Sequence, residues 1–229
     1  VRYFEQTNDV QLLRRAYPSL CREFREYWCA DHHSTSTGLA TNRDLGDPEL
    51  RPELAAEAEI TDFTACFEGD VRRCNPVLTN AALAQYSKLL GVIADELGLK
   101  DEAADWRTET DRRVALIGEL LWDDKEGFYF DYRHDEGRRI RCWSLTGFAP
   151  LWYGLATPEQ AERAVGHLSR FLNRRGLAQT DLAYPSPHPE FAWVQFGYPA
   201  GWPSMNLLTV MALDRYGFAG EAETIATRY

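Results

Sequence analysis

Apolar residues recur at helical spacing through the first half of the chain. The stripe in residues 8–29 is interrupted by Pro18, and because proline fits only a break or the first turn of a helix, we expect two helices divided at Tyr17-Pro18. A second stripe covers residues 82–97 and stops at a glycine, and a third covers residues 103–121. Only a few residues join these last two stripes, so the sequence predicts that the two helices lie antiparallel.

The second half of the chain contains shorter elements. A small β-hairpin is predicted within residues 126–142, where aromatic residues precede a glycine turn and a basic run. Thr157-Pro158-Glu159-Gln160 predicts a helix start with a capping box, and residues 204–216 return to a helical pattern. We therefore expect an all-α fold with one hairpin, which a central sheet of four or more strands would contradict.

Two long loops separate the helical segments. Residues 30–52 are rich in turn-forming residues, and residues 177–203 lack a helical period and hold several prolines and aromatic residues. Long loops inside compact domains are often functional. The first loop contains His32 and His33, which we interpret as solvated residues because adjacent side chains point apart and no third metal ligand follows at a useful spacing. The sequence predicts no metal site.

Successive antiparallel helix pairs with long loops on alternate connections favour an α/α toroid, in which helix ends surround a pocket. No repeat of fixed period indicates a solenoid instead. The predicted helices amount to about half to two thirds of such a barrel. We therefore expect residues 1–229 to be a single fragment of a catalytic domain, truncated at both ends and exposing an apolar face where further helices belong.

The composition is that of an acidic globular protein. Its 229 residues are 45% hydrophobic, which is ample for a buried core. The formal net charge of -10 argues against a nucleic-acid partner, because such proteins neutralise phosphates with Lys and Arg. No apolar run approaches the roughly 20 residues of a membrane span. Four arginine pairs are interpreted as solvated surface: Arg14-Arg15, Arg72-Arg73, Arg138-Arg139 and Arg174-Arg175.

The five cysteines form an odd set without a Cys-x-x-Cys pair. The sequence therefore signals neither a zinc ribbon nor a complete disulfide framework. Cys21, Cys29 and Cys142 are interpreted as small apolar core residues.

The densest group of candidate catalytic residues lies in residues 51–64. Asp62 follows an Ala/Glu-rich run, stands between two threonines and precedes Phe63, which would anchor it beside a core. Aromatic surroundings disfavour the charged form of a carboxyl group, and this is how a general acid stays protonated near neutrality. The residues alone also fit a helix cap, since Asp and Thr are common in caps and turns.

Six segments carry a family resemblance through their order along the chain. They are Leu20-Cys21-Arg22-Glu23-Phe24-Arg25-Glu26-Tyr27-Trp28, Asn42-Arg43-Asp44, Arg51-Pro52-Glu53, Asp62-Phe63-Thr64, Pro76-Val77-Leu78-Thr79-Asn80 and Gln195-Phe196-Gly197-Tyr198-Pro199-Ala200-Gly201-Trp202-Pro203. In this order they resemble six motifs of the trehalases, glycoside hydrolase family 37, and of their relatives in family 63. The motifs are Leu-x-Lys-Glu-Tyr-x-x-Trp, Asn-Arg-Tyr, Pro-Arg-Pro-Glu, Glu-Ser-Gly-Trp-Asp-Phe-Ser, Pro-Val-Asp-Leu-Asn and Gln-Trp-Asp-Tyr-Pro-Asn-Gly-Trp-Ala-Pro.

The resemblance implies a partial (α/α)6 barrel and an inverting glycoside hydrolase that acts on trehalose or a related α-glucoside without a cofactor. It assigns Asp62 as the general acid that protonates the leaving glycosidic oxygen. Inverting hydrolysis needs a second carboxylate roughly 6.5–9.5 Å away, with a water between the two. In trehalases this base follows the loop motif and two further helices, so we expect it beyond Tyr229, and the chain would need the remainder of its own domain. Glu190 and Asp181 are rival candidates within the chain.

The resemblance also implies a set of residues that bind the carbohydrate. Arginine donates as a fork, carboxylates accept, and aromatic faces cover the C–H faces of a pyranose. Asn80 fits either a sugar contact or a helix cap. The implied set is Arg51, Glu53, Asn80, Gln195, Tyr198 and Trp202.

Departures from the motifs leave alternative functions open. Ile60-Thr61 replaces the Gly-Trp before the acid, and Phe196-Gly197 replaces Trp-Asp in the loop motif. A family 63-like substrate, such as a glucosyl or mannosyl glycerate or an oligosaccharide, is therefore an alternative. A non-catalytic helical module that binds a carbohydrate or a protein is an alternative of another class. A third alternative, an α/α-barrel isomerase that acts on a free sugar, is disfavoured, because it would need His167 or His188 placed in a pocket as a catalytic histidine.

Overall fold

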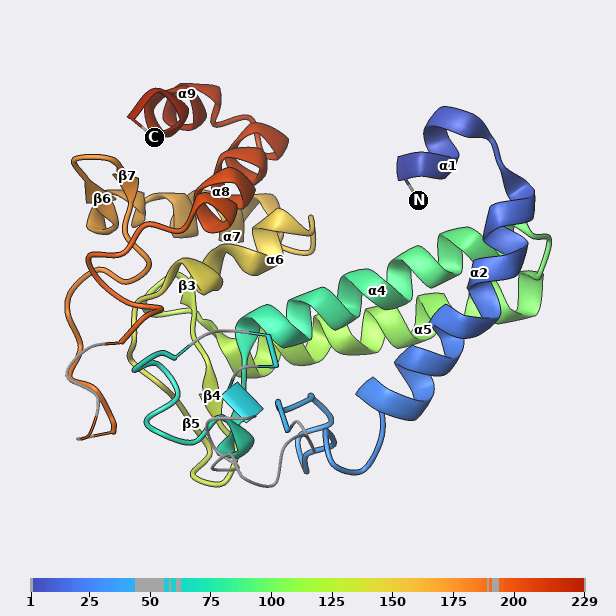
Figure 1. Cartoon of the computed structure of the whole chain (residues 1–229), viewed down its shortest axis with the longest axis horizontal. Helices are drawn as coiled ribbons and strands as arrows, with labels where there is room; N and C mark the ends of the chain where they lie inside the picture. Colours follow the sequence, from blue (N-terminus) through green and yellow to red (C-terminus); the bar gives the residue numbers. More distant parts are fainter. Residues whose placement is uncertain are drawn as a thin grey trace.

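The computed structural model describes residues 2–43, 56–57, 59–60, 63–188, 190 and 194–228. Most of these residues are helical (Figure 1). The α-helices are α1 (Arg2–Thr7), α2 (Val10–Arg22), α4 (Val77–Glu96), α5 (Lys100–Leu116), α6 (Ala149–Trp152), α7 (Pro158–Val165), α8 (Pro203–Arg215) and α9 (Ala219–Arg228). The described residues also contain two π-helical turns, η1 (Glu23–Trp28) and η3 (Ile117–Leu121), and three 3-10 turns, η2 (Val71–Arg73), η4 (Leu145–Phe148) and η5 (Leu168–Arg170). Ala56 and Glu57 are helical as well.

The antiparallel pair α4 and α5 runs through the middle of the molecule (Figure 1). Gly98, with φ +77°, ends α4 and lets the chain reverse. The two helices approach closely at Gly91, where an added Cβ would lie 3.3 Å from the Cβ of Trp106. The antiparallel pair predicted from the two apolar stripes is confirmed.

The break predicted at Tyr17-Pro18 is wrong, because Pro18 lies inside the continuous helix α2. The chain instead breaks before α2, where Asp9 caps the helix by accepting a hydrogen bond from Leu12 N at 2.9 Å. The cost of proline inside a helix is offset by tertiary contacts of the neighbouring turn. Tyr17 is buried, and its hydroxyl group donates to Glu102 at 2.9 Å and accepts from Trp106 Nε1 at 2.8 Å.

The strands are short and lie in three small sheets. Strands β1 (Cys74–Asn75), β4 (Tyr132–Arg133) and β5 (Arg138–Arg139) form an antiparallel sheet in the order β1-β4-β5. The other two sheets are hairpins, β2 (Trp122–Asp123) with β3 (Phe128–Tyr129) and β6 (Leu172–Asn173) with β7 (Gly176–Leu177). The hairpin predicted within residues 126–142 corresponds to β4 and β5, but the prediction of a single hairpin is wrong. Sheets this small leave the helical fold class intact.

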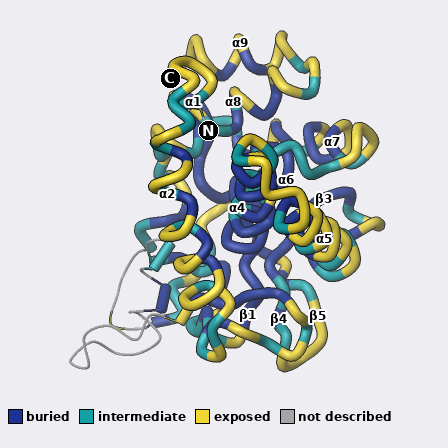
Figure 2. The backbone as a smooth tube through the Cα atoms, turned by 90° about the vertical axis from the view of Figure 1, so that its right-hand side faces the viewer, coloured by how far each residue is buried: buried dark blue, intermediate teal, exposed yellow. Residues whose placement is uncertain are grey.

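The two larger buried clusters both include residues of α4, a helix that is largely buried (Figure 2). One contains Leu13, Tyr17, Phe24, Leu90 and Trp106 and attaches α2 to the α4–α5 pair. The other lies under α6, α7 and α8 and contains four fully buried phenylalanines: Phe128, Phe130, Phe148 and Phe171.

A disulfide bond joins Cys66 to Cys142 across 76 residues of sequence. Both residues are buried beside Phe67 and Ile140. Cys142 is therefore a covalent link and not only a small core residue, which corrects the sequence-based interpretation. The free cysteines are Cys21, Cys29 and Cys74, and Cys29 is exposed, contrary to its predicted place in the core.

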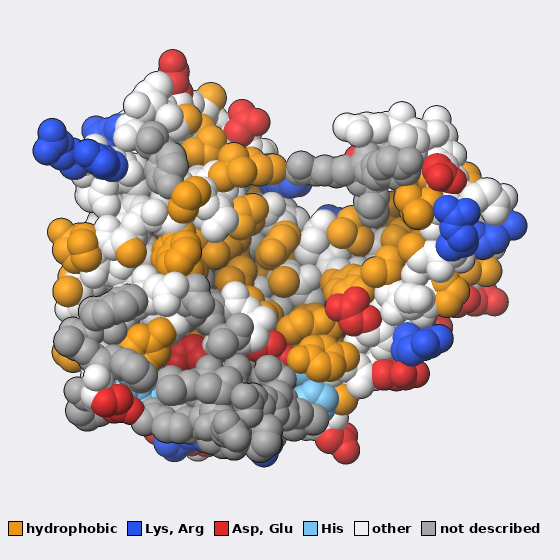
Figure 3. All heavy atoms as spheres, in the orientation of Figure 1, with side chains coloured by type: hydrophobic (Ala, Val, Ile, Leu, Met, Phe, Trp, Pro, Cys, Tyr) orange, Lys and Arg blue, Asp and Glu red, His pale blue; other side chains and the backbone are white. Residues whose placement is uncertain are grey.

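One face of the molecule is hollowed between the α1–α2 end and α8, and apolar side chains lie along this hollow (Figure 3). Helix α8 has two exposed apolar residues one turn apart, Leu207, which is 60% exposed, and Met211. This agrees with the expected exposed apolar face. Among the described residues, none of the helices combines the length and the apolar character needed to cross a membrane.

Candidate active site

The acid-rich stretch meets the second long loop through one backbone hydrogen bond. Phe196 N donates to Phe63 O at 2.7 Å, and the Phe63 ring lies 5.3 Å from the ring of His188. Phe63 directly follows Asp62, and Phe196 directly follows Gln195. The backbone beside the predicted acid is therefore held against the backbone beside a predicted sugar-binding residue. Asp62, Arg51 and Glu53 lie outside the described residues, so their own convergence stays a prediction.

Gln195 and Trp202 lie together in the second loop. Trp202 Nε1 donates to Gln195 O at 3.4 Å, and the Trp202 ring is 5.7 Å from that of Phe196. Trp202 immediately precedes α8, so the helix N-terminus fixes its backbone. The structure thus brings together two residues that the sequence predicts to bind sugar.

Tyr198 presents an accessible aromatic surface in the described part of this loop. Its side chain is 44% exposed, while its backbone N donates to Thr180 Oγ1 at 2.7 Å. Tyr198 and Gln195 line an open pocket of about 630 Å³ together with Tyr184 and Pro185. This volume is within the range of small-molecule sites, roughly 300–1,000 Å³.

Asn80 has a structural role, which corrects both sequence-based interpretations of it. It is fully buried in α4, its Nδ2 donates to the carbonyl oxygens of Ala40 and Pro76, and its Oδ1 accepts from Ala40 N at 2.8 Å. These bonds attach the first long loop to the start of α4. The side chain presents no surface to a ligand, and the N-cap of α4 is Pro76.

Glu57 is a buried carboxyl group close to the predicted acid. Its Oε1 accepts a hydrogen bond from Thr64 N at 2.6 Å, which joins the chain on the two sides of Asp62. The side chain is almost inaccessible, and burial raises the pKa of Glu57 to about 7 although the bond from Thr64 opposes this shift. Glu57 is therefore too buried to reach a substrate, but it holds the backbone of Thr64, two residues after Asp62 in the sequence.

His33 forms a buried ion pair with Glu59, which is two residues after Glu57. His33 Nε2 lies 2.7 Å from Glu59 Oε1, and Nδ1 lies 2.9 Å from the carbonyl oxygen of Tyr27. The carbonyl oxygen of Tyr27 can only accept, so Nδ1 donates to it, and Nε2 faces the carboxyl group of Glu59. His33 is fully buried, which shows that its interpretation as a solvated loop residue is wrong.

Glu59 also joins two parts of the first long loop, because it binds both His33 and Arg43. Its Oε2 accepts from Arg43 N at 2.9 Å, and its Oε1 accepts from the Tyr27 hydroxyl group. Burial alone would raise the pKa of Glu59, but hydrogen bonds from His33 and Tyr27 and the charge of His33 hold this pKa below its ordinary value of 4.5. The sequence missed Glu57 and Glu59 because only two of the acids in this stretch, Glu53 and Asp62, were assigned a role.

The charge of Glu59 is expected to stabilise the fold at neutral pH. Because its pKa is lower in the folded state, this contribution is present above pH 4.5 and is lost as the pH falls through the folded-state pKa. Glu59→Gln keeps the shape but removes the charge, so it should lower the free energy of unfolding by about 1–3 kcal/mol at pH 7. Urea unfolding at several pH values measures this difference, which should shrink below pH 4.5.

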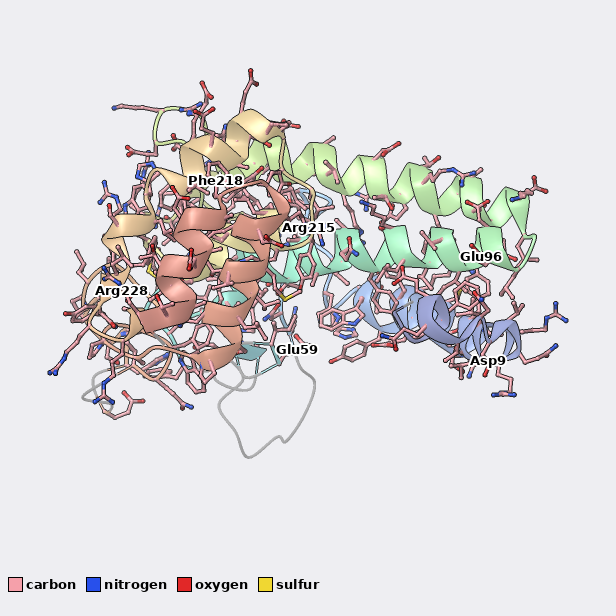
Figure 4. The ribbon with its side chains drawn as sticks, turned by 90° about the horizontal axis from the view of Figure 1, so that it is seen from above. Asp9, Glu59, Glu96, Arg215, Phe218 and Arg228 are labelled. Carbon is pink, nitrogen blue, oxygen red and sulfur yellow. A yellow bond between two sulfur atoms is a disulfide. The ribbon has the colours of Figure 1, made fainter. Side chains whose placement is uncertain are left out.

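Glu96→Gln supplies the matched control, since Glu96 is an exposed residue on α4 far from Glu59 (Figure 4). It should change the unfolding free energy by less than about 0.5 kcal/mol. An equal loss in both variants, or a loss for Glu59→Gln that is independent of pH, would show that the charge of Glu59 is not what stabilises the loop.

Three further carboxyl groups differ in their surroundings. Asp131 is buried, and burial raises its pKa to about 7, but its Oδ1 accepts from Val77 N at 2.7 Å and thus satisfies the start of α4. Asp181 accepts from the Tyr184 hydroxyl group at 2.9 Å and faces Arg170 at 3.9 Å. Glu190 is exposed. Among the described residues, no group of three His, Cys, Asp or Glu side chains is arranged to hold a metal ion.

Solved structures with a similar arrangement of helices identify the class of fold. The neutral trehalase of Saccharomyces cerevisiae matches with a TM-score of 0.82 and 24% identity, covering 97% of this chain and 51% of that one. A family 63 mannosylglycerate hydrolase from Thermus thermophilus matches with a TM-score of 0.57 and 24% identity, covering 69% of this chain and 37% of that one. The fold is therefore that of the helical α/α-barrel glycosidases.

Sequence comparison then defines the family. The trehalase family model matches residues 55–229. The probable trehalase of Eremothecium gossypii is 34% identical over 276 residues, covering 96% of this chain and 37% of that protein, and the cytosolic neutral trehalase of Beauveria bassiana is 33% identical over 250 residues, covering 98% and 32%. The chain belongs to the trehalase family. It spans only about a third of the length of these relatives.

Proposed function

We propose that this chain is part of the catalytic domain of an inverting glycoside hydrolase that acts on trehalose or a related α-glucoside. The observation that carries the proposal is the Phe196–Phe63 hydrogen bond, because it joins the stretch holding Asp62 to the aromatic loop holding Gln195 and Trp202. Membership of the trehalase family and relatives that are named trehalases support the same substrate.

In the proposed reaction, Asp62 donates its proton to the glycosidic oxygen as the bond to the anomeric carbon breaks. A second carboxylate takes a proton from a water on the opposite face of the sugar, and that water bonds to the anomeric carbon. Glu57 and Glu59 hold the backbone on both sides of the acid through their bonds to Thr64 and Arg43. The aromatic surfaces of Trp202 and Tyr198 bind the sugar rings.

Product stereochemistry gives the test of this function. The natural protein that contains this chain is incubated with α,α-trehalose, and the anomeric protons of the products are followed by NMR. Inversion produces one molecule of α-glucose and one of β-glucose from each trehalose, whereas retention produces only the α anomer at first. Glucosylglycerate serves as the competing substrate. A protein that binds trehalose without releasing glucose would support the non-catalytic module, and initial formation of only α-glucose would exclude inversion.

A further inference from the structure

The four arginine pairs of this chain have different environments in the structure. Two are neutralised or bonded: Arg72 pairs with Asp70 and Arg73 with Asp135, while Arg138 pairs with Glu68 and Arg139 donates to Glu119 O. Within the described residues, neither Arg14 and Arg15 on α2 nor Arg174 and Arg175 make an ion pair, and all four are exposed. Although the protein has a net charge of -10, these two pairs have no acidic partner among the residues that the structure describes.

Arg174 and Arg175 differ from Arg14 and Arg15 because they line a pocket. The pocket has a volume of about 610 Å³ and lies between the turn of the β6–β7 hairpin and the Tyr198-Pro199 segment. Its lining residues are Asn173, Arg174, Arg175, Tyr198, Pro199 and Gly201. Basic side chains gather at the edge of the molecule near β6 and β7 in Figure 3. We name this pocket the arginine pocket.

Hydrogen bonds hold the two walls of the arginine pocket in a fixed position. Asn206 of α8 accepts from Leu177 N at 2.7 Å and donates to the carbonyl oxygens of Leu177 and Trp202. Gln179 N donates to Ala200 O at 2.7 Å. The hairpin and the second loop are therefore one packed unit, which fixes the backbone of Arg174 and Arg175 relative to that of Tyr198.

The side chains that line the arginine pocket suit a ligand that carries both an anionic group and a sugar. Asn173 Oδ1 accepts from Arg175 N at 2.8 Å, which shapes the turn and leaves the Nδ2 amide as an additional donor. Guanidinium groups match the oxygens of phosphate and carboxylate as forked donors. The half-exposed Tyr198 ring offers a face to a sugar, and Tyr198 and Pro199 also line the pocket that contains Gln195.

We propose that the arginine pocket binds the oxyanion of a sugar derivative, either a phosphate or a carboxylate, beside the carbohydrate pocket. This binding does not require hydrolysis, so it stands or fails separately from the proposed catalytic function.

Isothermal titration calorimetry on the full chain tests the proposal with three probes: glucose 6-phosphate, glucuronate and glucose. The double variant Arg174→Ala/Arg175→Ala is compared with Arg14→Ala/Arg15→Ala, which makes the same change in charge on an exposed helix face. A third variant, Arg174→Lys/Arg175→Lys, keeps the charge but loses the forked geometry. Circular dichroism verifies that each variant is folded.

At least one anionic sugar is expected to bind more tightly than glucose, and the better of the two identifies the preferred oxyanion. Arg174→Ala/Arg175→Ala should weaken this binding about tenfold or more, since charged hydrogen bonds are lost. Arg14→Ala/Arg15→Ala should change the affinity for the anionic sugar less than about twofold, because salt screens the effect of these distant charges on the pocket. Equal binding of glucose, absence of binding by both anions, or equal weakening by the two alanine variants would overturn the proposal.

Discussion

Asp62→Asn is expected to lower kcat for trehalose hydrolysis by roughly 10²–10⁴-fold in the natural protein that contains this chain. Asparagine has nearly the shape of aspartic acid, so the substrate should still bind and KM should change little. Its amide cannot transfer a proton to the glycosidic oxygen, and the glucose leaving group must then depart as an alkoxide. Steady-state release of glucose by the variant and the wild-type protein measures this effect.

A substrate that needs no protonation distinguishes an acid from a merely structural residue. Fluoride leaves without the help of a general acid. The Asp62→Asn variant should therefore lose much less activity toward α-glucosyl fluoride than toward trehalose. Asp105→Asn is the control, because Asp105 is exposed on α5. If the variant lost the same fraction of its activity toward trehalose and toward the fluoride, Asp62 would not be the acid. If Asp62→Asn retained most of its activity toward trehalose, the site assignment would fail.

The structure suggests how the backbone around Asp62 is held for this chemistry. Glu57 and Glu59 lie on the same side of Asp62 in sequence, yet they bind backbone groups on different sides of the loop, at Thr64 and at Arg43. Their carboxylates are buried, so these bonds face little competition from water. Two side chains outside the acid motif therefore hold the backbone groups of Thr64 and Arg43 in place.

The helices could be predicted from the sequence because their signal is local. The stripes that became α4 and α5 repeat every three to four residues, and the capping box at Thr157 and Gln160 is complete within one turn. Pro18 was misinterpreted because the contacts that stabilise its helix come from Trp106 and Glu102, more than eighty residues later. Rules based on local sequence include the destabilisation of a helix by proline, but they do not include stabilising contacts from residues far away in the sequence.

The candidate site could be predicted only in part, for the same reason. The order of the motifs pointed to Gln195 and Trp202, which the structure brings together. His33 has no local sequence signal that distinguishes a buried ion pair from a solvated residue, because its partner Glu59 lies 26 residues away. Asn80 matched a motif by position, but the carbonyl of Ala40 that occupies its amide was visible only in three dimensions.

Loss of the Cys66–Cys142 disulfide bond is expected to lower the free energy of unfolding by about 2–5 kcal/mol, because the unfolded chain regains the freedom of a loop that the bond had closed across 76 residues. The melting temperature should fall on the order of 10 °C for a domain of this size. Cys66→Ala, Cys142→Ala and the double variant should lose similar amounts, since any one of them breaks the same bond. Reductant should destabilise the wild-type protein and the Cys29→Ser control, whose cysteine is free, but none of the three alanine variants.

A thiol titration in denaturant without reductant measures the bond directly. Five cysteines with one disulfide leave three reactive thiols in each chain, those of Cys21, Cys29 and Cys74. The segment from Phe63 to Cys74 carries the backbone partners of Glu57 and Phe196, and the disulfide fixes it to the chain just after β5. Five reactive thiols in the oxidised protein, or a melting temperature that reductant does not change, would show that this segment is held by packing alone.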